Sequence, residues 1–488
     1  MVEIVGELAY KLFMSPKNKN TKKDSLLVQL RDFGLGSIIG MAISMFTVPI
    51  TTRMLAPEEY GKSSLFTLFH SLFLIVGLLG IDQGYVRYYN NKEIDRAKLF
   101  QNALFFPTLL STVLVLVSII FYKPISNFLF GSLEIGLFVA FCFFVPTVIL
   151  NRFLFLQIRM DLRGKTYSFL NILSQIINFG FLLVFLLFYR KSFHSIIYAS
   201  IISGFINTFI AFLFCNKDFI THKFEYEAHL QKDLIKFSLP LVPATVLSWL
   251  LNSFDKVGLR AWSDFYQLGL YSAAFKIVAL LSVFQSIFST AWIPIAYKWY
   301  EEKVPNEQFE RISTLVLAIM VCVFSFIFVF RNLIMAFLGE AYRNTVQVLV
   351  FLLFVPVMYT VSETTGLGIN FAKKSMYHLY VFIIATGLNL IGNFLLIPRY
   401  GAVGAAVTTC ISYIVYFWIK TLISRRLWFK FRLEKYFFNI LLLLAFGINI
   451  ILWQNKIIEI AVFLTIIIFN IVLVATTLKK KERPAIGG

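Results

Sequence analysis

Long apolar segments alternate with short polar ones along almost the whole chain. A helix needs about 20 mostly apolar residues to cross the hydrocarbon core of a membrane. The pattern therefore predicts an all-α membrane protein with about fourteen transmembrane helices, at residues 33–52, 63–82, 99–122, 128–150, 166–188, 194–215, 235–254, 266–292, 312–331, 345–368, 376–397, 401–423, 434–453 and 457–478.

Composition supports this prediction, and charge adds an orientation. The 488 residues are 58% hydrophobic and only 15% charged, with 55 Phe, whereas soluble proteins carry about 25% charged residues. A net charge of +19 would suit a nucleic-acid partner, but the basic residues lie between the apolar segments. If both termini are cytoplasmic, the inner segments hold 33 Lys and Arg, the outer loops hold 11, and Lys276 is the remaining one of 45. This bias predicts cytoplasmic termini and no nucleic-acid partner.

Neither the N-terminus nor the cysteines suggest processing or metal chemistry. The first 25 residues contain no continuous apolar region and no small-residue cleavage site, so no signal peptide is predicted. The four cysteines lie in apolar runs without metal-ligand spacing, so we expect no disulfide, metal or cofactor.

The chain contains an internal repeat. The end of the first predicted helix and the start of the second read TRMLAPEEYGKSSLF, and the seventh and eighth read LRAWSDFYQLGLYSAAF. Pro146 and Tyr167 are 21 residues apart, as are Pro356 and Tyr377. Helices 1–6 and 7–12 are therefore predicted to be duplicated units with the same orientation, and helices 13 and 14 to be an addition.

The segments MLAPEEYGKSSLF, GIDQGYVRYYN and NSFDKVGLRAWSDFYQLGLYSAAFKI resemble polysaccharide flippases of the Wzx type. The similarity covers about residues 25–480 and places the chain in the superfamily of lipid II flippases and MATE antiporters. It implies two six-helix lobes around a central cavity. It also implies alternating access, which moves an oligosaccharide on polyprenyl pyrophosphate to the outer leaflet. Fourteen helices is the number in lipid II flippases, whereas many Wzx-type members have twelve, so a lipid II flippase and a MATE-like multidrug or cation antiporter stay as alternatives.

These considerations predict six consecutive regions. They are a basic cytoplasmic segment (1–30), an N-terminal lobe (31–216), a cytoplasmic linker (217–232), a C-terminal lobe (233–424), helices 13 and 14 (425–480) and a cytoplasmic tail (481–488).

Lys276 is the main candidate for substrate binding. It lies about ten residues into the eighth predicted helix, near the middle of the membrane, where a charge is costly unless it has a partner or a function. We expect it to face a cavity and bind a pyrophosphate or an acidic sugar. The alternative is a partnership with a buried acid that only fixes helix packing.

Further polar residues are candidates for lining the same cavity. His70 lies near midplane in the second predicted helix, and amide side chains form stripes on the fifth and eleventh. Interhelical hydrogen bonding is the alternative for all of them. The candidates are His70, Gln175, Asn178 and Asn389.

Charged residues at the helix ends are candidates for gates. Asp255 and Lys256 lie near the outer surface, and Asp255 is predicted to pair with Arg53 or Arg260 when the cavity opens inward; an interfacial surface pair is the alternative. The candidates for an inner gate are Arg31, Asp82, Arg87, Arg152 and Glu363. The alternative is that the basic ones only anchor the helix ends on the cytoplasmic side and that the acidic ones are their partners.

The residues argue against other function classes. All outer loops are short, which leaves no room for the active-site domain of a glycosyltransferase or polymerase, and no phosphate-cradling GxxxxGK[ST] motif is present. No enzyme is therefore expected. An intramembrane lysine suits an anionic substrate better than the cation exchange of an antiporter. The expected partners are a lipid-linked oligosaccharide, membrane lipids, a coupling ion (H⁺ or Na⁺) and polysaccharide polymerase machinery, for a monomer in the cytoplasmic membrane.

Overall fold

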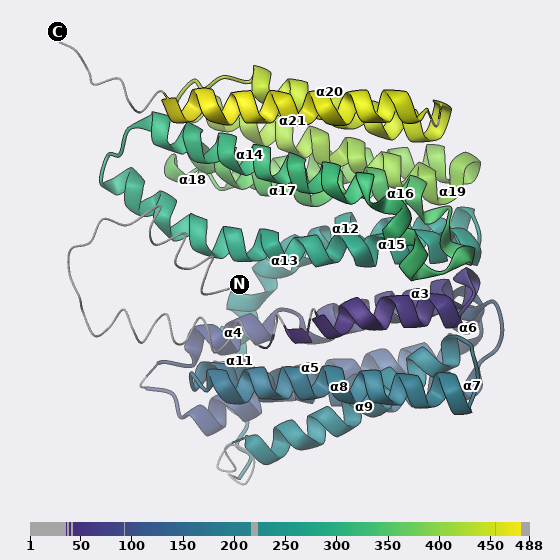
Figure 1. Cartoon of the computed structure of the whole chain (residues 1–488). Coiled ribbons are helices and arrows are strands. Elements are labelled where there is room, and N and C mark those ends of the chain that lie inside the picture. Colours follow the sequence, from purple (N-terminus) through teal and green to yellow (C-terminus); the bar gives the residue numbers. More distant parts are fainter. Residues whose placement is uncertain are drawn as a thin grey trace. The chain divides into compact units, whose positions relative to one another are not determined.

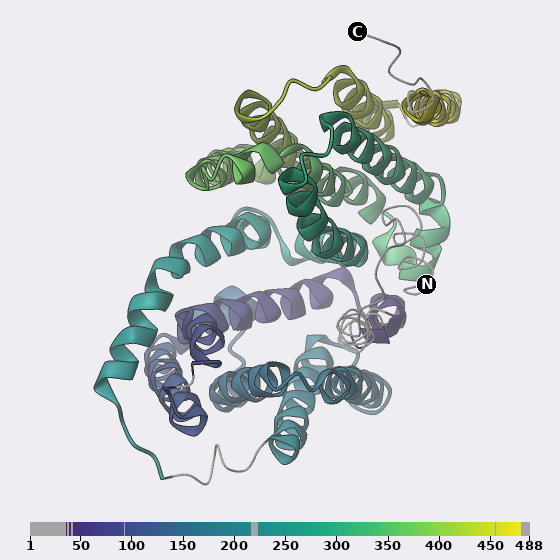
Figure 2. The same ribbon diagram turned by 90° about the vertical axis from the view of Figure 1, so that its left-hand side faces the viewer.

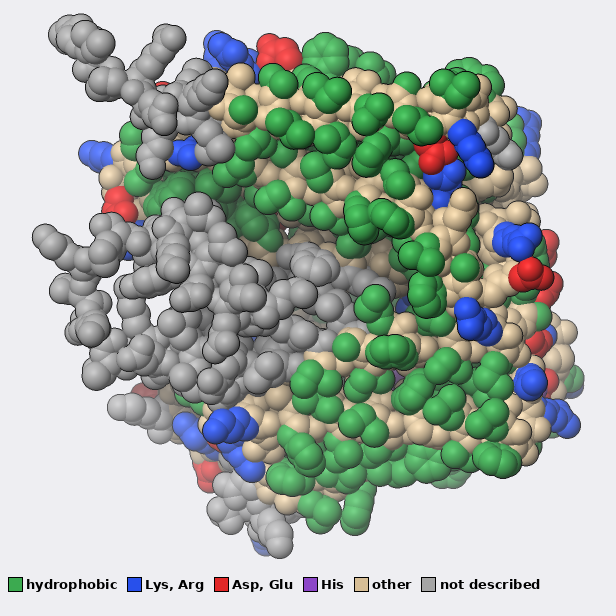
Figure 3. All heavy atoms as spheres, in the orientation of Figure 1, with side chains coloured by type: hydrophobic (Ala, Val, Ile, Leu, Met, Phe, Trp, Pro, Cys, Tyr) green, Lys and Arg blue, Asp and Glu red, His purple; other side chains and the backbone are tan. Residues whose placement is uncertain are grey.

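The computed structural model describes residues 36, 39–40, 42–91, 93–215, 223–453 and 455–479, and these are almost all helical (Figure 1). Within them, ten helices are long and apolar enough to cross a membrane. Hydrophobic side chains cover the middle of the helices that Figure 3 shows, and charged side chains gather at their ends. The predicted all-α, multi-pass membrane class is therefore confirmed.

The ten helices account for eleven of the fourteen predicted spans, because one of them, α19 (Met376–Leu427), contains two. The predicted spans 33–52, 235–254 and 266–292 are not among the ten. The number fourteen stays a prediction. Arg31 and the terminal segments 1–30 and 481–488 lie outside the described residues.

The chain divides into two compact units. Unit 1 holds the residues up to Thr47 and Phe69–Val242, and unit 2 holds Val48–Leu68 and the residues from Pro243 on. The division falls inside α3 (Pro57–Leu78), which contributes its first half to unit 2 and its second half to unit 1. The lobe boundaries predicted from the repeat stay a prediction.

Unit 1 is a bundle in which α8 packs against α9, α9 against α7, and α7 against α5 (Figures 1 and 2). Its buried core includes Tyr85, Phe100 and Phe153. Besides the second half of α3, its elements are α4 (Ile81–Tyr88), α5 (Arg96–Ile120), α6 (Tyr122–Phe130), α7 (Ile135–Met160), α8 (Gly164–Phe188), α9 (Phe193–Phe214), α11 (Ala228–Ser238) and η1 (Leu239–Leu241).

A left-handed turn separates α3 from α4. Leu79 and Gly80 have φ angles of 46° and 73°, which ends α3 and redirects the chain. A Cβ on Gly84 of α4 would lie 2.8 Å from Ser238 Oγ and 3.1 Å from a Leu234 methyl carbon. Glycine therefore permits the close packing of α4 on α11.

Unit 2 is larger, and in it α14 packs against both α17 and α21 (Figure 1). Besides the first half of α3 and α19, its elements are α12 (Val242–Trp262), α13 (Phe265–Glu301), α14 (Asn306–Val329), α15 (Arg331–Leu338), η2 (Glu340–Tyr342), α16 (Thr345–Leu352), α17 (Phe354–Thr365), α18 (Leu367–Phe371), α20 (Glu434–Ile448), η3 (Asn449–Trp453) and α21 (Lys456–Lys479).

The 52 residues of α19 form two antiparallel helices. Gly401 has φ 54° and ψ −130°, a conformation outside the helical region. Asn389 donates to Thr409 Oγ1 over 3.2 Å, although the two residues are 20 positions apart. The chain therefore reverses near Gly401. Gln267 of α13 supports the reversal by accepting a hydrogen bond from the Ala402 amide at 3.0 Å.

The beginnings of α3 and α13 meet in a contact that is symmetric in the sequence repeat. A Cβ on Gly61 would lie 2.4 Å from the Phe265 carbonyl oxygen, and one on Gly269 would lie 1.9 Å from the Pro57 carbonyl oxygen. Ser272 donates a hydrogen bond to Ser64 over 2.8 Å, across 208 positions of the sequence. We call this contact the repeat seam. Gly61 and Gly269 are also 208 positions apart in the sequence. Each half of the repeat therefore makes the same contact with the other half, as the two subunits do across a two-fold interface.

Two ion pairs fix the last two helices to the rest of unit 2. Lys435 of α20 pairs with Glu310 of α14 at 2.9 Å and donates to Thr314 at 2.8 Å. At the other end, Arg331 of α15 pairs with Glu459 of α21 through both guanidinium nitrogens. Helices α20 and α21 are therefore an integral part of unit 2.

Candidate functional site

Lys276 lies in α13 and has an exposed side chain, although the residues before it in the helix, Ala273 and Ala274, are buried. Within the described residues it forms no ion pair, so the structure shows no buried acid that neutralises it. Lys256 of α12 lies close enough to experience its positive charge, and the Lys256 ammonium lies 5.1 Å from the Phe275 ring centroid. Two basic side chains of neighbouring helices therefore lie near each other in unit 2, next to Asp255.

Asp255, the residue before Lys256, has the most densely hydrogen-bonded carboxylate of unit 2. Its side chain is 1% exposed. Oδ1 accepts hydrogen bonds from Asn389 at 3.2 Å and from Asn393 at 2.6 Å. Oδ2 accepts from Thr409 at 2.6 Å and from Tyr271. Four neutral donors from α13 and both halves of α19 thus surround one buried negative charge.

This arrangement presents oxygen atoms of the kind that bind a small cation. A buried carboxylate without a directly bonded cation is costly, and a proton or a metal ion would reduce that cost. Asn393 Oδ1 is buried and has no hydrogen-bond partner among the described residues, so it is a free oxygen next to the carboxylate. Oxygen donors of this kind suit hard cations. The described residues contain no cluster of three or more His, Cys, Asp or Glu that could hold a transition metal.

Neither arginine predicted to pair with Asp255 contacts it in this structure. Arg53 donates to the carbonyl oxygens of Phe337 at 3.1 Å and Ala336 at 2.8 Å, and so caps the end of α15. The Arg260 guanidinium lies 4.3 Å from the Phe265 ring centroid. The predicted outer gate, which refers to an inward-open cavity, stays a prediction.

Of the inner-gate candidates, Asp82 and Arg152 pair with each other, and Glu363 pairs with a residue that was not a candidate. Arg152 of α7 binds the buried Asp82 of α4 through two nitrogens, at 2.7 and 3.2 Å, in unit 1. Glu363 of α17 pairs with Lys420 of α19 at 2.9 Å in unit 2. Arg87 is exposed in the last turn of α4. Their role in gating stays a prediction.

Of the predicted cavity residues, only Asn389 joins the Asp255 cluster. His70 is half-buried in α3 and stacks on Phe144, with ring centroids 5.0 Å apart. On α8, Gln175 is exposed and Asn178 is half-buried. His70, Gln175 and Asn178 belong to unit 1.

Sequence reasoning missed Lys420, Tyr271 and Thr409. The ammonium of Lys420 is almost fully buried and also lies 5.7 Å and 5.4 Å from the ring centroids of Tyr359 and Tyr416. A signal for it existed, because Lys420 lies within an apolar run before the basic segment at 425–432. Tyr271 and Thr409 are neutral and carried no such signal.

A buried carboxylate hydrogen-bonded between helices, in a chain with many apolar helices, is typical of the class of membrane transporters. Residues 33–299, more than half of the chain, match the family described as "Polysaccharide biosynthesis protein". The chain belongs to this family, and the resemblance to polysaccharide flippases is confirmed.

Named relatives agree with this family. The capsular polysaccharide biosynthesis protein CapF of Staphylococcus aureus is 23% identical over 264 residues, which cover 52% of this chain but only 66% of CapF. The "Probable low-salt glycan biosynthesis flippase Agl15" of Haloferax volcanii is 22% identical over 394 residues, which cover 78% of this chain and 79% of that protein.

Solved structures show the fold. The lipid II flippase MurJ, in an inward closed conformation, has a TM-score of 0.69 at 16% identity and covers 92% of this chain and 98% of its own. A multidrug resistance MATE transporter of the MOP superfamily, in an outward-facing conformation, has a TM-score of 0.53 at 18% identity and covers 82% of this chain and 94% of its own. The chain therefore has the MurJ and MATE fold.

Proposed function

We propose that this protein moves an oligosaccharide linked to polyprenyl pyrophosphate from the inner to the outer leaflet of the cytoplasmic membrane, by alternating access, for the synthesis of a cell-surface polysaccharide. It acts as a carrier and catalyses no covalent step. Family membership and the name of Agl15 support a glycan substrate. Both termini lie in the cytoplasm in this proposal, as the distribution of basic residues predicts.

The observation that carries the proposal is Lys276 of α13, which is exposed and forms no ion pair with any residue that the structure describes. A diphosphate brings about two negative charges into a region of low dielectric and requires a cationic partner there. A lysine ammonium is a mobile point charge, which can follow a phosphate through a conformational change. Lys256 adds a second positive charge from the adjacent helix.

The Asp255 cluster is proposed to hold the coupling ion. It supplies a buried carboxylate, a free amide oxygen and hydroxyl groups. Binding of H⁺ or Na⁺ would neutralise the carboxylate and change its hydrogen bonds to α13 and to α19. Ion binding would thereby bias the arrangement of these helices, which is what ion-driven transport requires.

The test is export of glycan by a deletion strain that carries plasmid copies of the protein. We expect Lys276→Ala to reduce export at least tenfold at normal protein abundance, and Lys276→Arg to retain part of it. Lys123→Ala, on the exposed surface of α6, is the matched control and should export normally. Normal export by Lys276→Ala would contradict the proposed role of the lysine.

The deletion strain itself separates the alternatives. The proposed function predicts that labelled lipid-linked oligosaccharide accumulates in the inner leaflet. Accumulation of lipid II would favour the lipid II flippase. Increased drug sensitivity without any accumulated lipid intermediate would favour the antiporter, for which the buried Asp255 is the supporting observation.

A further inference from the structure

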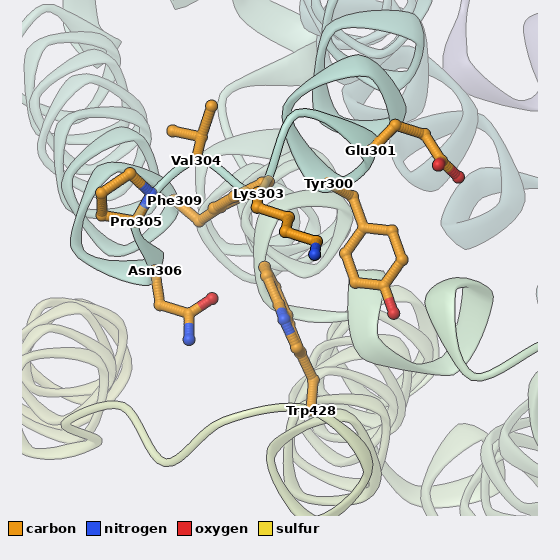
Figure 4. A pocket seen from close by; sticks show the side chains of 8 residues that line it. All are labelled: Tyr300, Glu301, Lys303, Val304, Pro305, Asn306, Phe309 and Trp428. Carbon is orange, nitrogen blue, oxygen red and sulfur yellow. The ribbon is translucent and has the colours of Figure 1, made fainter.

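A second polar site lies away from Lys276 and Asp255, where α13 ends and α14 begins. A pocket of about 480 Å³ opens there, and the end of α19 forms its opposite wall (Figure 4). Its volume lies within the range of about 300–1,000 Å³ that is usual for small-molecule sites. The residues that matter for recognition are Tyr300, Lys303, Asn306, Phe309 and Trp428.

The aromatic walls of the pocket are held by one another. Trp428 meets Phe309 edge to face, with ring centroids 4.8 Å apart and planes at 87°. Tyr300 stacks on Phe371 at 4.0 Å, and Phe371 in turn meets Trp428 at 4.8 Å and 85°. The ring faces are therefore pre-oriented. An aromatic face carries partial negative charge and attracts the C–H groups on one face of a sugar ring.

The pocket also presents one free cation. Lys303 has φ 53°, and its amide donates to the Tyr300 carbonyl at 3.2 Å as it ends α13. Its ammonium points toward Tyr300 and Trp428, whereas the Glu301 carboxylate points away from them (Figure 4). Lys303 forms no ion pair within the described part of the chain, while the nearby Glu302 pairs with Lys298 at 3.6 Å.

Basic residues border the pocket on the α19 side, whereas the turn from α13 to α14 also carries Glu301, Glu302, Glu307 and Glu310. The segment 425–432, with Trp428 at its centre, contains four basic residues and no acidic one. Asn306, on the α14 side of the pocket, supplies an amide that can both donate and accept hydrogen bonds. The Glu301 carboxylate also lines the pocket and can accept hydrogen bonds from hydroxyl groups. Aromatic faces, an ammonium, an amide and a carboxylate together match a ligand that has a sugar ring, hydroxyl groups and a phosphate.

We propose that this pocket binds a phosphorylated sugar headgroup and is the first docking site of the glycan on the cytoplasmic side. This inference rests on the proposed function and on the predicted orientation, which places residues 302–305 in the cytoplasm. Lys303 binds the phosphate as a point charge, and Trp428 and Tyr300 contact the sugar ring. The headgroup docks here before its pyrophosphate reaches Lys276.

Binding to the purified full-length protein tests the proposal directly. The protein in nanodiscs of phosphatidylcholine is titrated by calorimetry with α-D-glucose 1-phosphate, glucose and inorganic phosphate. We expect saturable binding of glucose 1-phosphate and about tenfold weaker binding of the other two ligands, because each lacks one of the two recognised groups. Lys303→Gln should weaken glucose 1-phosphate binding about tenfold, as expected for loss of one charge-assisted contact. Lys298→Gln, at the same helix end but outside the pocket, is the control and should bind normally.

Several results would overturn the proposal. They are an absence of saturable binding, equal binding by Lys303→Gln and wild type, or inorganic phosphate binding as tightly as the sugar phosphate. Nanodiscs that contain phosphatidylglycerol test whether the pocket binds the phosphate of a membrane lipid instead of a sugar phosphate. If they abolish glucose 1-phosphate binding, the site belongs to a membrane lipid and the proposal fails. Trp428→Leu is a second variant, which removes an aromatic wall of the pocket. If Trp428→Leu does not fold, Lys303→Gln still tests the proposal.

The fate of this inference can be separated from that of the proposed function. Lys276→Ala should bind glucose 1-phosphate at the pocket normally while it fails to export glycan. Glycan export that persists without any binding at the pocket would refute the docking site alone. Binding without accumulation of a lipid-linked oligosaccharide in the deletion strain would refute the proposed function.

Discussion

The carboxylate of Asp255 is buried among neutral hydrogen-bond donors, unlike a charge on the protein surface. All four side chains that donate hydrogen bonds to it are neutral. The charge state of Asp255 therefore decides whether these donors bind a carboxylate anion or a neutral carboxyl group. A proton or cation that binds there changes the interactions of three helices at once.

Asp255→Asn should fold and insert, because the shape is kept and the amides of Asn389 and Asn393 can turn to restore the hydrogen bonds. We expect it to lose the dependence of transport on pH or Na⁺ concentration. The measurement is export by reconstituted vesicles across pH 5.5–8.5 and with or without an inward Na⁺ gradient. An unchanged ion dependence would show that coupling occurs elsewhere.

Sequence reasoning identified the charged members of this site and Asn389, but not Tyr271 and Thr409. Lys276 and Asp255 stand out because a charge within an apolar run is rare. Thr409 and Tyr271 are ordinary residues of membrane helices, and only the tertiary fold brings them to Asp255. Lys420 was missed because a lysine near a helix end usually extends to the membrane surface and does not stand out in the sequence.

At the scale of elements, the repeat seam leaves no room for side chains. A Cβ on Gly269 would lie 1.9 Å from the Pro57 carbonyl oxygen, so α3 and α13 must separate if the residue grows. We expect Gly269→Ala to destabilise the protein by about 1–3 kcal/mol, as overpacking usually does, and to lower its melting temperature in detergent.

Gly387→Ala is the matched control for this variant, because nothing lies within 4 Å of its added methyl group. It should melt at the wild-type temperature or slightly above it, since alanine favours a helix over glycine. Equal melting temperatures for both variants would mean that the seam is looser than the structure shows.

The ion pair between Lys420 and Glu363 joins α17 to the second half of α19. Their side chains are only 6% and 13% exposed. Lys420→Met leaves an unpaired buried carboxylate, so it should cost about 3–5 kcal/mol and lower the melting temperature. The double variant Lys420→Met with Glu363→Met should recover most of that loss. A double variant as unstable as the single one would show that Lys420 matters for its packing on Tyr359 and Tyr416.

The elements themselves were largely predictable, because spans of about 20 apolar residues are a strong signal. The helix pair within α19 was predicted with its break between residues 397 and 401, next to Gly401. The amphipathic helix α15 was not predicted, because eight residues between two spans give only a weak periodic signal.

For the whole molecule, the distribution of basic residues predicts one orientation in the membrane. Single cysteines on a background without the four native ones can test it. We expect a membrane-impermeant thiol reagent to label Asn344→Cys on intact cells and to label His229→Cys only after the cells are opened. Both side chains are exposed. The opposite labelling pattern would invert the orientation and would move the pocket near Trp428 to the outer face.

The repeat seam also bears on the origin of the chain. Because Gly61 faces the residues around Gly269, and Gly269 faces those around Pro57, each half offers the other the same surface. Two copies of one six-helix ancestor would make this contact as a homodimer. If the predicted repeat arose by gene duplication and fusion, the contact would have been preserved, while sites such as Lys276 and Asp255 could diverge in one half alone. A dimer of an ancestral half-length protein would therefore have had a symmetric contact at this seam. Differences in functional residues between the two halves would have come later.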